Sequence, residues 1–301
     1  GLPLSPLAAA NNTIRYFSLA RYALLDALRM LKVGAGSRVL LPSFICRDLL
    51  APIAMLGAEP CWYPLGAEMS PESPPEVWPV ADVVIAVNFF GFPQDLAPFE
   101  RYVQRTGATL IEDNAHGYLS QDSLGDWLGT RAKIGLFSVR KTFRFPDGGA
   151  LMVRNDAPKD GLAEQLPFAG TGLHSAQTFK NRIRRLPLFG PALLKASVML
   201  ARAARKWRTG SATPLPDPES ERLIREDPYP WQGLLGALSR VDAPTEIARR
   251  RRLYEVCAAE GRRVGVLSVF PRLPDNCAPY GYPFRSDTAG RQAMQALASR
   301  L

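Results

Sequence analysis

The stretch LFSVRKTFRFPDGGAL, residues 136–151, carries the pattern on which the fold prediction rests. It contains the end of an apolar run, predicted as a buried strand over residues 134–139. After a Gly-Gly turn it enters a second apolar segment, predicted as a strand over residues 149–153. Ser138 and Lys141 stand where the first strand ends. Because ligands of open parallel sheets gather at the carboxyl ends of strands, this stretch indicates a ligand site.

Helix-like and strand-like segments alternate through the first two-thirds of the chain, working outward from this stretch. This alternation predicts an α/β domain with a largely parallel sheet. Continuous apolar runs such as VVIAVNF indicate strands that are covered on both faces. Further predicted strands span residues 38–44, 60–65, 83–89 and 108–112, and predicted helices span residues 20–31, 46–56 and 94–105.

The positive charge of the chain is concentrated in one segment, residues 180–208. The net charge is +9. The segment is predicted to form one or two basic amphipathic helices, most simply a solvated pair, although attraction of an anionic sugar nucleotide and contact with a membrane surface are alternative interpretations. Nucleic acid is not expected as a partner, because no recognition motif accompanies the charge. The segment contains no acidic residue, and its basic residues are Lys180, Arg182, Arg184, Arg185, Lys195, Arg202, Arg205, Lys206 and Arg208.

The second half of the chain suggests a smaller domain. Residues 209–220 are rich in proline and serine and are predicted to be a linker. Residues 241–260 are predicted as a long charged helix, and the chain ends in a predicted strand and a helix capped by Ser286 or Asp287. We therefore expect a large α/β domain over residues 1–175, the basic helical segment and linker over 176–220, and a smaller α+β domain over 221–301.

The cysteines and histidines exclude several classes of site. The four cysteines are scattered without a C-x-x-C pair, which argues against a zinc site or a disulfide framework and favours a reducing compartment. With only two histidines, no histidine-rich metal centre is expected. The first residues lack a basic start followed by an apolar run, so we expect no signal peptide and a cytoplasmic protein.

Three polar clusters at predicted strand ends together suit one kind of cofactor. IEDNAHG at 111–117 places Asp113 and His116 after an apolar strand, and YFSLARYAL at 16–24 places Ser18 where it is expected to cap the next helix. A cofactor with an aldehyde, a pyridine nitrogen and a phosphate needs three kinds of partner. These are a lysine amine, a carboxylate, and backbone N–H groups at a helix N-terminus helped by a hydroxyl or an arginine.

These segments resemble the DegT/StrS-type sugar aminotransferases, pyridoxal-phosphate (PLP) enzymes of fold type I. SLARYAL at 18–24 is similar to the family's S-G-[RT]-x-A-L, with one extra residue and alanine in place of the common glycine. EDNAH at 112–116 resembles E-D-x-A-[QH], and the segment from Phe137 to Gly149 resembles the shorter F-S-x-R-K version ahead of P-D-G-G. Residues 40–65 and 87–96 match two further family segments in the same order. The resemblance covers residues 15–155, and more loosely 238–301.

The resemblance implies a role for each matching residue. It implies that Lys141 forms the Schiff base with PLP, that Asp113 pairs with the pyridine nitrogen and that His116 lies near the ring hydroxyl. The phosphate is then bound by Ser138 and by the start of the first helix. The remaining implied contacts are Ala20 and Arg21 at the phosphate and Cys46 against the ring face.

The same resemblance implies an aspartate-aminotransferase-like fold and an activity. The activity is transfer of an amino group from an amino acid, glutamate in our prediction, to a keto-sugar that is linked to a nucleotide. It also implies a homodimer in which the active sites are completed across the interface. The chain ends after one helix that follows YPF, where members of the family continue for several more elements, so we expect a shortened C-terminal domain.

Each residue also has a simpler interpretation. Lys141 lies between two arginines and would suit a solvated basic turn, and Asp113 would suit a helix cap. His116 would suit a packed histidine, Arg21 a helix-surface charge, and Cys46 a small buried hydrophobic residue. Two other functions stay open, namely a sugar dehydratase of the same fold and a catalytically silent scaffold subunit. The retained Lys141 argues against the dehydratases, in which histidine replaces the lysine.

Overall fold

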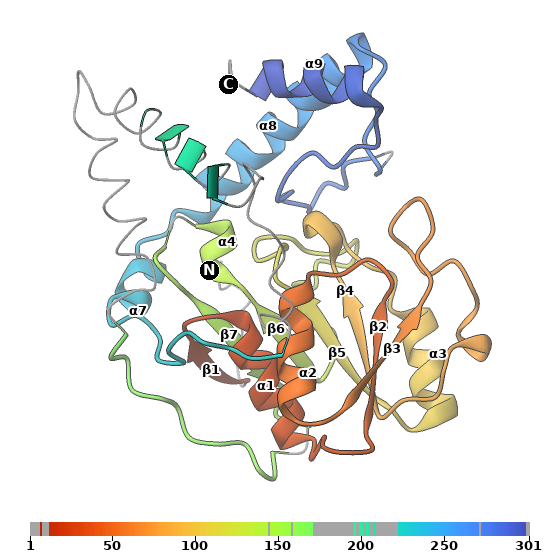
Figure 1. Ribbon diagram of the computed structural model, residues 1–301, viewed down its shortest axis with the longest axis vertical. Coiled ribbons are helices and arrows are strands. Elements are labelled where there is room, and N and C mark those ends of the chain that lie inside the picture. Colours follow the sequence, from red (N-terminus) through yellow and green to blue (C-terminus); the bar gives the residue numbers. More distant parts are fainter. Residues whose placement is uncertain are drawn as a thin grey trace.

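The computed structural model describes residues 7, 12–143, 145–157, 159–170, 222–270 and 272–298, and short helical pieces between 196 and 208. Most of the described chain belongs to one sheet with its covering helices, and the rest lies beyond one edge of that sheet (Figure 1). The strands are β1 (Thr13–Phe17), β2 (Arg38–Pro42), β3 (Glu59–Tyr63), β4 (Val83–Val87), β5 (Thr109–Asn114), β6 (Ile134–Phe137) and β7 (Gly149–Val153).

The sheet has seven strands in the order β1-β7-β6-β5-β4-β2-β3. The five strands from β3 to β6 pair in parallel, whereas β7 is antiparallel to both of its neighbours. The register places Asp113 beside Val87 of β4 and beside Leu136 of β6. The carboxyl ends of β4, β5 and β6 therefore meet at one edge, and the prediction of a mostly parallel α/β sheet is confirmed.

Alternating side chains of the central strands enter two hydrophobic cores, one on each face of the sheet. Val39 and Leu41 pack with α1 in one core, whereas Leu40, between them, packs with α3 in the other. The strands are buried on both faces, which explains why they appear in the sequence as continuous apolar runs. The helices are α1 (Ala20–Met30), α2 (Leu50–Met55), α3 (Ala97–Thr106), α4 (Val139–Thr142), α7 (Leu234–Leu238), α8 (Ala243–Arg263) and α9 (Thr288–Ala298).

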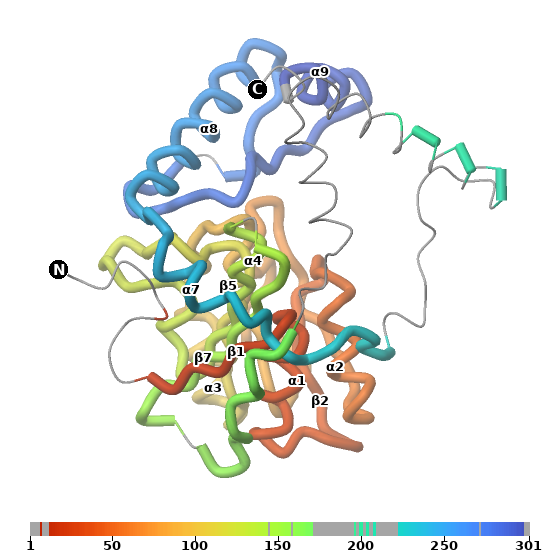
Figure 2. Tube along the Cα trace, turned by 90° about the vertical axis from the view of Figure 1, so that its left-hand side faces the viewer, coloured from red at the N-terminus to blue at the C-terminus, as the bar shows by residue number. Residues whose placement is uncertain are grey.

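The C-terminal part of the chain lies beyond the edge of the sheet where the parallel strands end. Figures 1 and 2 show α8 and α9 side by side there, away from α1 and α2. Asp242 caps α8 by accepting from the N–H of Thr245, and Asp287 accepts from the N–H of Gly290 in the first turn of α9, so the predicted cap by Asp287 is confirmed. The strand predicted before α9 is reduced to one bridge between Ser268 and Phe284.

Residues 226–231 return to the sheet before α8 begins. The N–H of Ser18 donates to the carbonyl of Pro228 at 3.0 Å, and the N–H of Trp231 donates to Asp147 Oδ1 at 3.1 Å. The division into domains at residues 175 and 220 stays a prediction. Most of the predicted basic helical segment and the whole predicted linker, residues 209–220, lie outside the described residues.

Candidate active site

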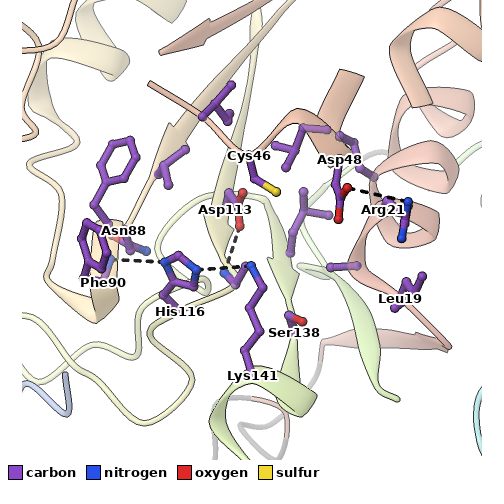
Figure 3. A pocket seen from close by; sticks show the side chains of 18 of the residues that line it. Leu19, Arg21, Cys46, Asp48, Asn88, Phe90, Asp113, His116, Ser138 and Lys141 are labelled. Carbon is purple, nitrogen blue, oxygen red and sulfur yellow. Dashed lines mark hydrogen bonds and ion pairs between the residues drawn. The ribbon is translucent and has the colours of Figure 1, made fainter. Parts of the chain in front are cut away.

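A cavity of about 310 Å³ lies at the carboxyl edge of the sheet. This volume is within the range of about 300–1,000 Å³ that is usual for small-molecule sites. Figure 3 shows side chains from β5, from the residues that follow β4 and β6, and from the start of α1 around it. All seven residues predicted for the site line this cavity, namely Ala20, Arg21, Cys46, Asp113, His116, Ser138 and Lys141.

Lys141 reaches the cavity from α4, the short helix that follows β6. Ser138, between β6 and α4, is 2% exposed, and its carbonyl accepts from the N–H of Lys141 at 3.0 Å. This turn directs the lysine side chain toward β5, where its Nζ lies 3.2 Å from Nε2 of His116 (Figure 3). The simpler interpretation of Lys141 as part of a solvated turn does not fit this position in the cavity wall.

His116 is held on three sides. Its Nδ1 accepts from the N–H of Phe90 at 3.3 Å, and its ring stacks on that of Tyr280 with centroids 4.5 Å apart and planes 8° apart. Because Nδ1 accepts a hydrogen bond, we assign the proton of the neutral ring to Nε2, which faces Lys141 and can donate to its amine when that amine is uncharged. Burial, with the neighbouring Lys141 charge, lowers the pKa of His116 to about 3, so the ring is neutral near pH 7.

Asp113 is the last but one residue of β5; it lines the cavity and is 5% exposed. Its Oδ1 accepts from the N–H of Ala115 at 2.9 Å. Burial raises the pKa of this carboxyl group, and the charge of Lys141 opposes that rise. A cationic N–H donor in the cavity would therefore stabilise the ionised form of this buried carboxyl group.

The start of α1 forms the opposite wall, but its cap differs from the prediction. The N-cap residue is Leu19, with no side-chain cap, because Ser18 Oγ donates instead to the carbonyl of Asp227. A Cβ atom on Gly149 would lie 2.3 Å from the carbonyl carbon of Leu19 and 2.4 Å from the nitrogen of Ala20. Only glycine lets β7 approach the first turn of α1 this closely.

Arg21 and Cys46 lie in the cavity wall with environments that the sequence did not indicate. The guanidinium of Arg21 is 3.0 Å from Glu226 Oε1 and 3.8 Å from Asp48 Oδ1, so its charge is already paired. The alternative interpretation of Cys46 as a buried hydrophobic residue is wrong, since this residue is exposed. It precedes the short turn Arg47–Leu49 and faces the cavity rather than the core.

A buried polar network behind the cavity supports the ends of β4 and β5. Glu112 is fully buried and accepts from the guanidinium of Arg131 at 2.7 and 2.9 Å. Asn88 joins the same group by donating to Glu112 at 2.8 Å, and it accepts from Arg131 at 2.9 Å. A buried ion pair with this many hydrogen bonds fixes the loop that carries Phe90.

Sequence reasoning missed several residues of the site: Asn88 and Phe90 after β4, Arg140 beside the lysine, and Tyr280 from the C-terminal part. Asn88 and Phe90 lie in the segment 87–96 that resembles the family, which was the signal available for them. Arg140 lines the cavity, and its Nε is buried without a hydrogen-bond partner. No local pattern indicated Tyr280, because it reaches His116 only through the tertiary fold.

The fold and the site define a fold-type I enzyme of the pyridoxal-phosphate class, with a lysine, a buried carboxylate and a helix N-terminus around one cavity. A sequence profile described as the DegT/DnrJ/EryC1/StrS aminotransferase family matches residues 17–188. The chain belongs to this family. Pyridoxal 5′-phosphate, the cofactor predicted from the sequence, is bound in a solved structure of the same fold.

Solved structures with the same fold are similar over nearly the whole chain. DesV of S. venezuelae has a TM-score of 0.59 at 18% identity, covering 95% of this chain and 67% of DesV. A DegT/DnrJ/EryC1/StrS aminotransferase of Brucella abortus gives 0.57 at 16% identity over 96% of this chain and 69% of its own. The GDP-4-keto-6-deoxy-D-mannose-3-dehydratase of E. coli, with bound PLP, gives 0.59 at 15% identity, covering 95% and 71%. At these identities the likeness shows the fold.

The residues present fit the cofactor of the family. The buried Asp113 carboxylate suits a protonated pyridine nitrogen, and the Lys141 amine lies in the same cavity. The unpartnered Nε of Arg140 and the N-terminal end of α1 suit a phosphate. Within the described residues, no helix is long and apolar enough to cross a membrane.

Proposed function

We propose that this chain is an aminotransferase that moves the amino group of an amino acid, glutamate in our proposal, to a keto-sugar linked to a nucleotide. The observation that carries the proposal is the contact between Lys141 Nζ and His116 Nε2, 3.2 Å, in a cavity that also contains the buried Asp113 carboxylate. An amine, a proton donor and a buried anion around one cavity are the groups that this chemistry needs.

Lys141, Asp113 and Ser138 would hold the cofactor, with the first turn of α1 and Arg140 at its phosphate and Cys46 beside its ring. When bound, pyridoxal phosphate supplies an electron-accepting ring that stabilises negative charge on a carbon of the substrate. Ala20 at the start of α1 contributes a backbone N–H group rather than a side chain. Arg21 would contribute electrostatically at most, because Glu226 and Asp48 compensate its charge.

Each of the three central side chains has a separate task in this proposal. Lys141 takes a proton from the α-carbon of the amino donor in the first half of the reaction, and in the second half it delivers a proton to the sugar carbon that gains the amine, as a positioned general base and acid. His116 orients the uncharged lysine amine through its Nε2–H, and its ring stays neutral, so it adds no positive charge beside Lys141 when the lysine is protonated. Asp113 keeps a negative charge at the far end of the cavity, which favours a cationic ring nitrogen there.

The remaining parts of the proposal concern the substrate and the assembly. The basic segment 180–208 supports an anionic, nucleotide-linked substrate through its charge. We keep the homodimer, the cytoplasmic location and the three-part division of the chain as predictions. The chain spans about two-thirds of the length of DesV and of the Brucella abortus aminotransferase. We therefore propose, as part of the same hypothesis, that this length is enough for a complete active site.

A product analysis tests the proposal. The purified chain is loaded with PLP and given glutamate and a panel of nucleotide-linked keto-sugars, and the sugar products are identified by mass spectrometry. We expect an amino-sugar together with one 2-oxoglutarate for each amine formed. Lys141→Ala should form neither, whereas Lys133→Ala, an exposed lysine at the opposite end of β6, should behave like the unchanged chain.

Two other outcomes would replace the proposal with its alternatives. A sugar product that has lost a hydroxyl group and gained no nitrogen would identify a dehydratase, like the E. coli neighbour of the same fold. Binding of the sugar nucleotide with no product of either kind would identify a catalytically silent subunit.

A further inference from the structure

Arg250 is a buried cation of the C-terminal part that the proposed chemistry does not use. It lies on α8, is 9% exposed, and directs its guanidinium toward three different groups. Its Nε donates to Glu246 Oε1 at 2.7 Å, its Nη1 donates to the carbonyl of Pro279 at 3.2 Å, and its Nη2 donates to the carbonyl of Thr142 at 2.5 Å. A planar guanidinium can serve three directions at once, which a lysine amine on a single flexible stem cannot do in the same way.

Both backbone carbonyls belong to residues beside the candidate active site. Thr142 follows Lys141 on α4, and its carbonyl lies at the C-terminal end of that short helix, where backbone acceptors lack helical partners. Pro279 precedes Tyr280, whose ring stacks on His116. One guanidinium is therefore bonded to the backbone on both sides of the contact between Lys141 and His116.

Further contacts complete a closed ring through the site. The N–H of Tyr280 donates to the carbonyl of Phe90 at 2.8 Å, and the N–H of Phe90 donates to Nδ1 of His116 at 3.3 Å. His116 contacts Lys141, whose neighbour Thr142 accepts from Arg250. The ring joins the lysine-bearing helix, the loop after β4 and the loop before α9.

The energetics indicate that this contact is specific. Burial lowers the pKa of Arg250, and the charge of Glu246 opposes that effect. Removing a cation from water is unfavourable unless an anion and hydrogen-bond acceptors replace the water, as Glu246 and the two carbonyls do here. The next residue, Arg251, offers a comparison because its Nη1 also binds two carbonyls, of Pro274 and Cys277, yet it has no contact with α4.

We propose that Arg250 is a positioning residue that sets the placement of Lys141 against His116. It does so by holding the end of α4 and the Pro279–Tyr280 backbone from α8. The inference rests on the proposed function, in which Lys141 is the lysine that carries the cofactor. It gives the C-terminal part of the chain a defined effect on the chemistry of the first domain.

The test compares Arg250→Met with Arg251→Met, a matched change one residue along the same helix. Both variants and the unchanged chain are titrated with PLP by absorbance, and the absorption of the bound cofactor is followed from pH 5 to 10. We expect Arg250→Met to weaken PLP binding by about tenfold or more, since small displacements of reacting groups have large effects. We also expect it to shift the pH midpoint of the absorption change by about half a unit or more.

Arg251→Met should change both quantities little, although both variants lose thermal stability. If Arg250→Met has the same affinity for PLP and the same pH midpoint of the absorption change as Arg251→Met, the inference is overturned. If Arg250→Met does not fold, the same measurements are made on Arg250→Lys, because lysine donates from a single nitrogen and cannot replace the three directions of the guanidinium. An unchanged pH midpoint of the absorption change in Arg250→Lys would also overturn the inference. Failure of the unchanged chain to attach PLP at Lys141 would instead contradict the proposed function.

Discussion

His116 shows how local contacts determine the charge state of a single residue in this site. It is neutral because the fold buries its ring next to Lys141 and provides the N–H of Phe90 as a donor to Nδ1. A protonated ring would lose that acceptor and add a second positive charge beside the lysine. The account therefore needs His116 as an uncharged donor and not as an acid.

This charge state predicts a pH dependence of stability. The pKa of His116 is lowered from 6.5 to about 3 in the folded protein. Between these two pH values the unfolded chain therefore binds more protons than the folded protein. Its contribution to the free energy of unfolding is complete above pH 6.5 and is lost as the pH falls toward 3. We measure the free energy of unfolding of the cofactor-free protein by urea denaturation, for the unchanged chain and for His116→Gln. The unchanged chain should be more stable at pH 7.5, and this difference in stability should be about 2 kcal/mol smaller at pH 4.5.

Comparing the two proteins at each pH removes the contribution of Asp147, which has the opposite sign. Burial raises the pKa of Asp147 to about 6, so its contribution is complete below pH 3.8 and is lost as the pH rises through 6. An advantage over His116→Gln that is independent of pH would show that His116 titrates normally, and the lowered pKa of the buried ring would then be wrong.

The residues of the site differed in how well they could be predicted from the sequence. Asp113, His116, Ser138 and Lys141 each follow an apolar strand directly, and neighbouring parallel strands then bring them together without further information. Tyr280 contributes through a stacking contact across 164 positions of the chain, counted from His116. The pairing of Arg21 with Glu226 likewise depends on a segment that returns from beyond residue 220.

Among the elements, β7 and α1 form the packing contact that places the helix N-terminus at the cavity. Gly149→Ala would put a methyl group 2.3 Å from the backbone of Leu19, where no flexible side chain can move away. We expect a loss of about 2–4 kcal/mol in the free energy of unfolding and weaker PLP binding, because the first turn of α1 must shift. Denaturant unfolding and an absorbance titration measure the two effects.

Gly281→Ala is the matched control, since no atom lies within 4 Å of a Cβ built there and its backbone conformation is open to alanine. It should alter both measurements little. A Gly149→Ala protein as stable as this control would mean that β7 and α1 do not pack as described.

The elements that the sequence failed to indicate are the short or solvent-facing ones. The strands and helices predicted between residues 20 and 112 appear with ends shifted by a few residues, and the central strands β2 and β4 are the most buried of them. In contrast, α4 and α7 have four and five residues, too few to show a helical period. β1 has no counterpart among the predicted strand ranges, although Tyr16 and Phe17 were interpreted as a strand end ahead of the first helix.

At the scale of the whole molecule, the carboxyl edge of the sheet is where the separate parts of the chain meet. The first domain supplies the cavity, residues 226–231 bind at the start of α1, and α8 reaches back to α4 through Arg250. Figure 2 shows α8 and α9 standing over this edge. The position of the second part of the chain and the chemistry of the site are therefore connected.

The central claim is that Lys141 carries the cofactor, and covalent trapping tests it most directly. The purified chain is incubated with PLP, its absorption spectrum is recorded, and the complex is reduced with borohydride and mapped by peptide mass spectrometry. The account predicts a visible absorption band and a pyridoxyl adduct on Lys141, both absent in Lys141→Ala. An adduct on another lysine, or no band at saturating PLP, would contradict it.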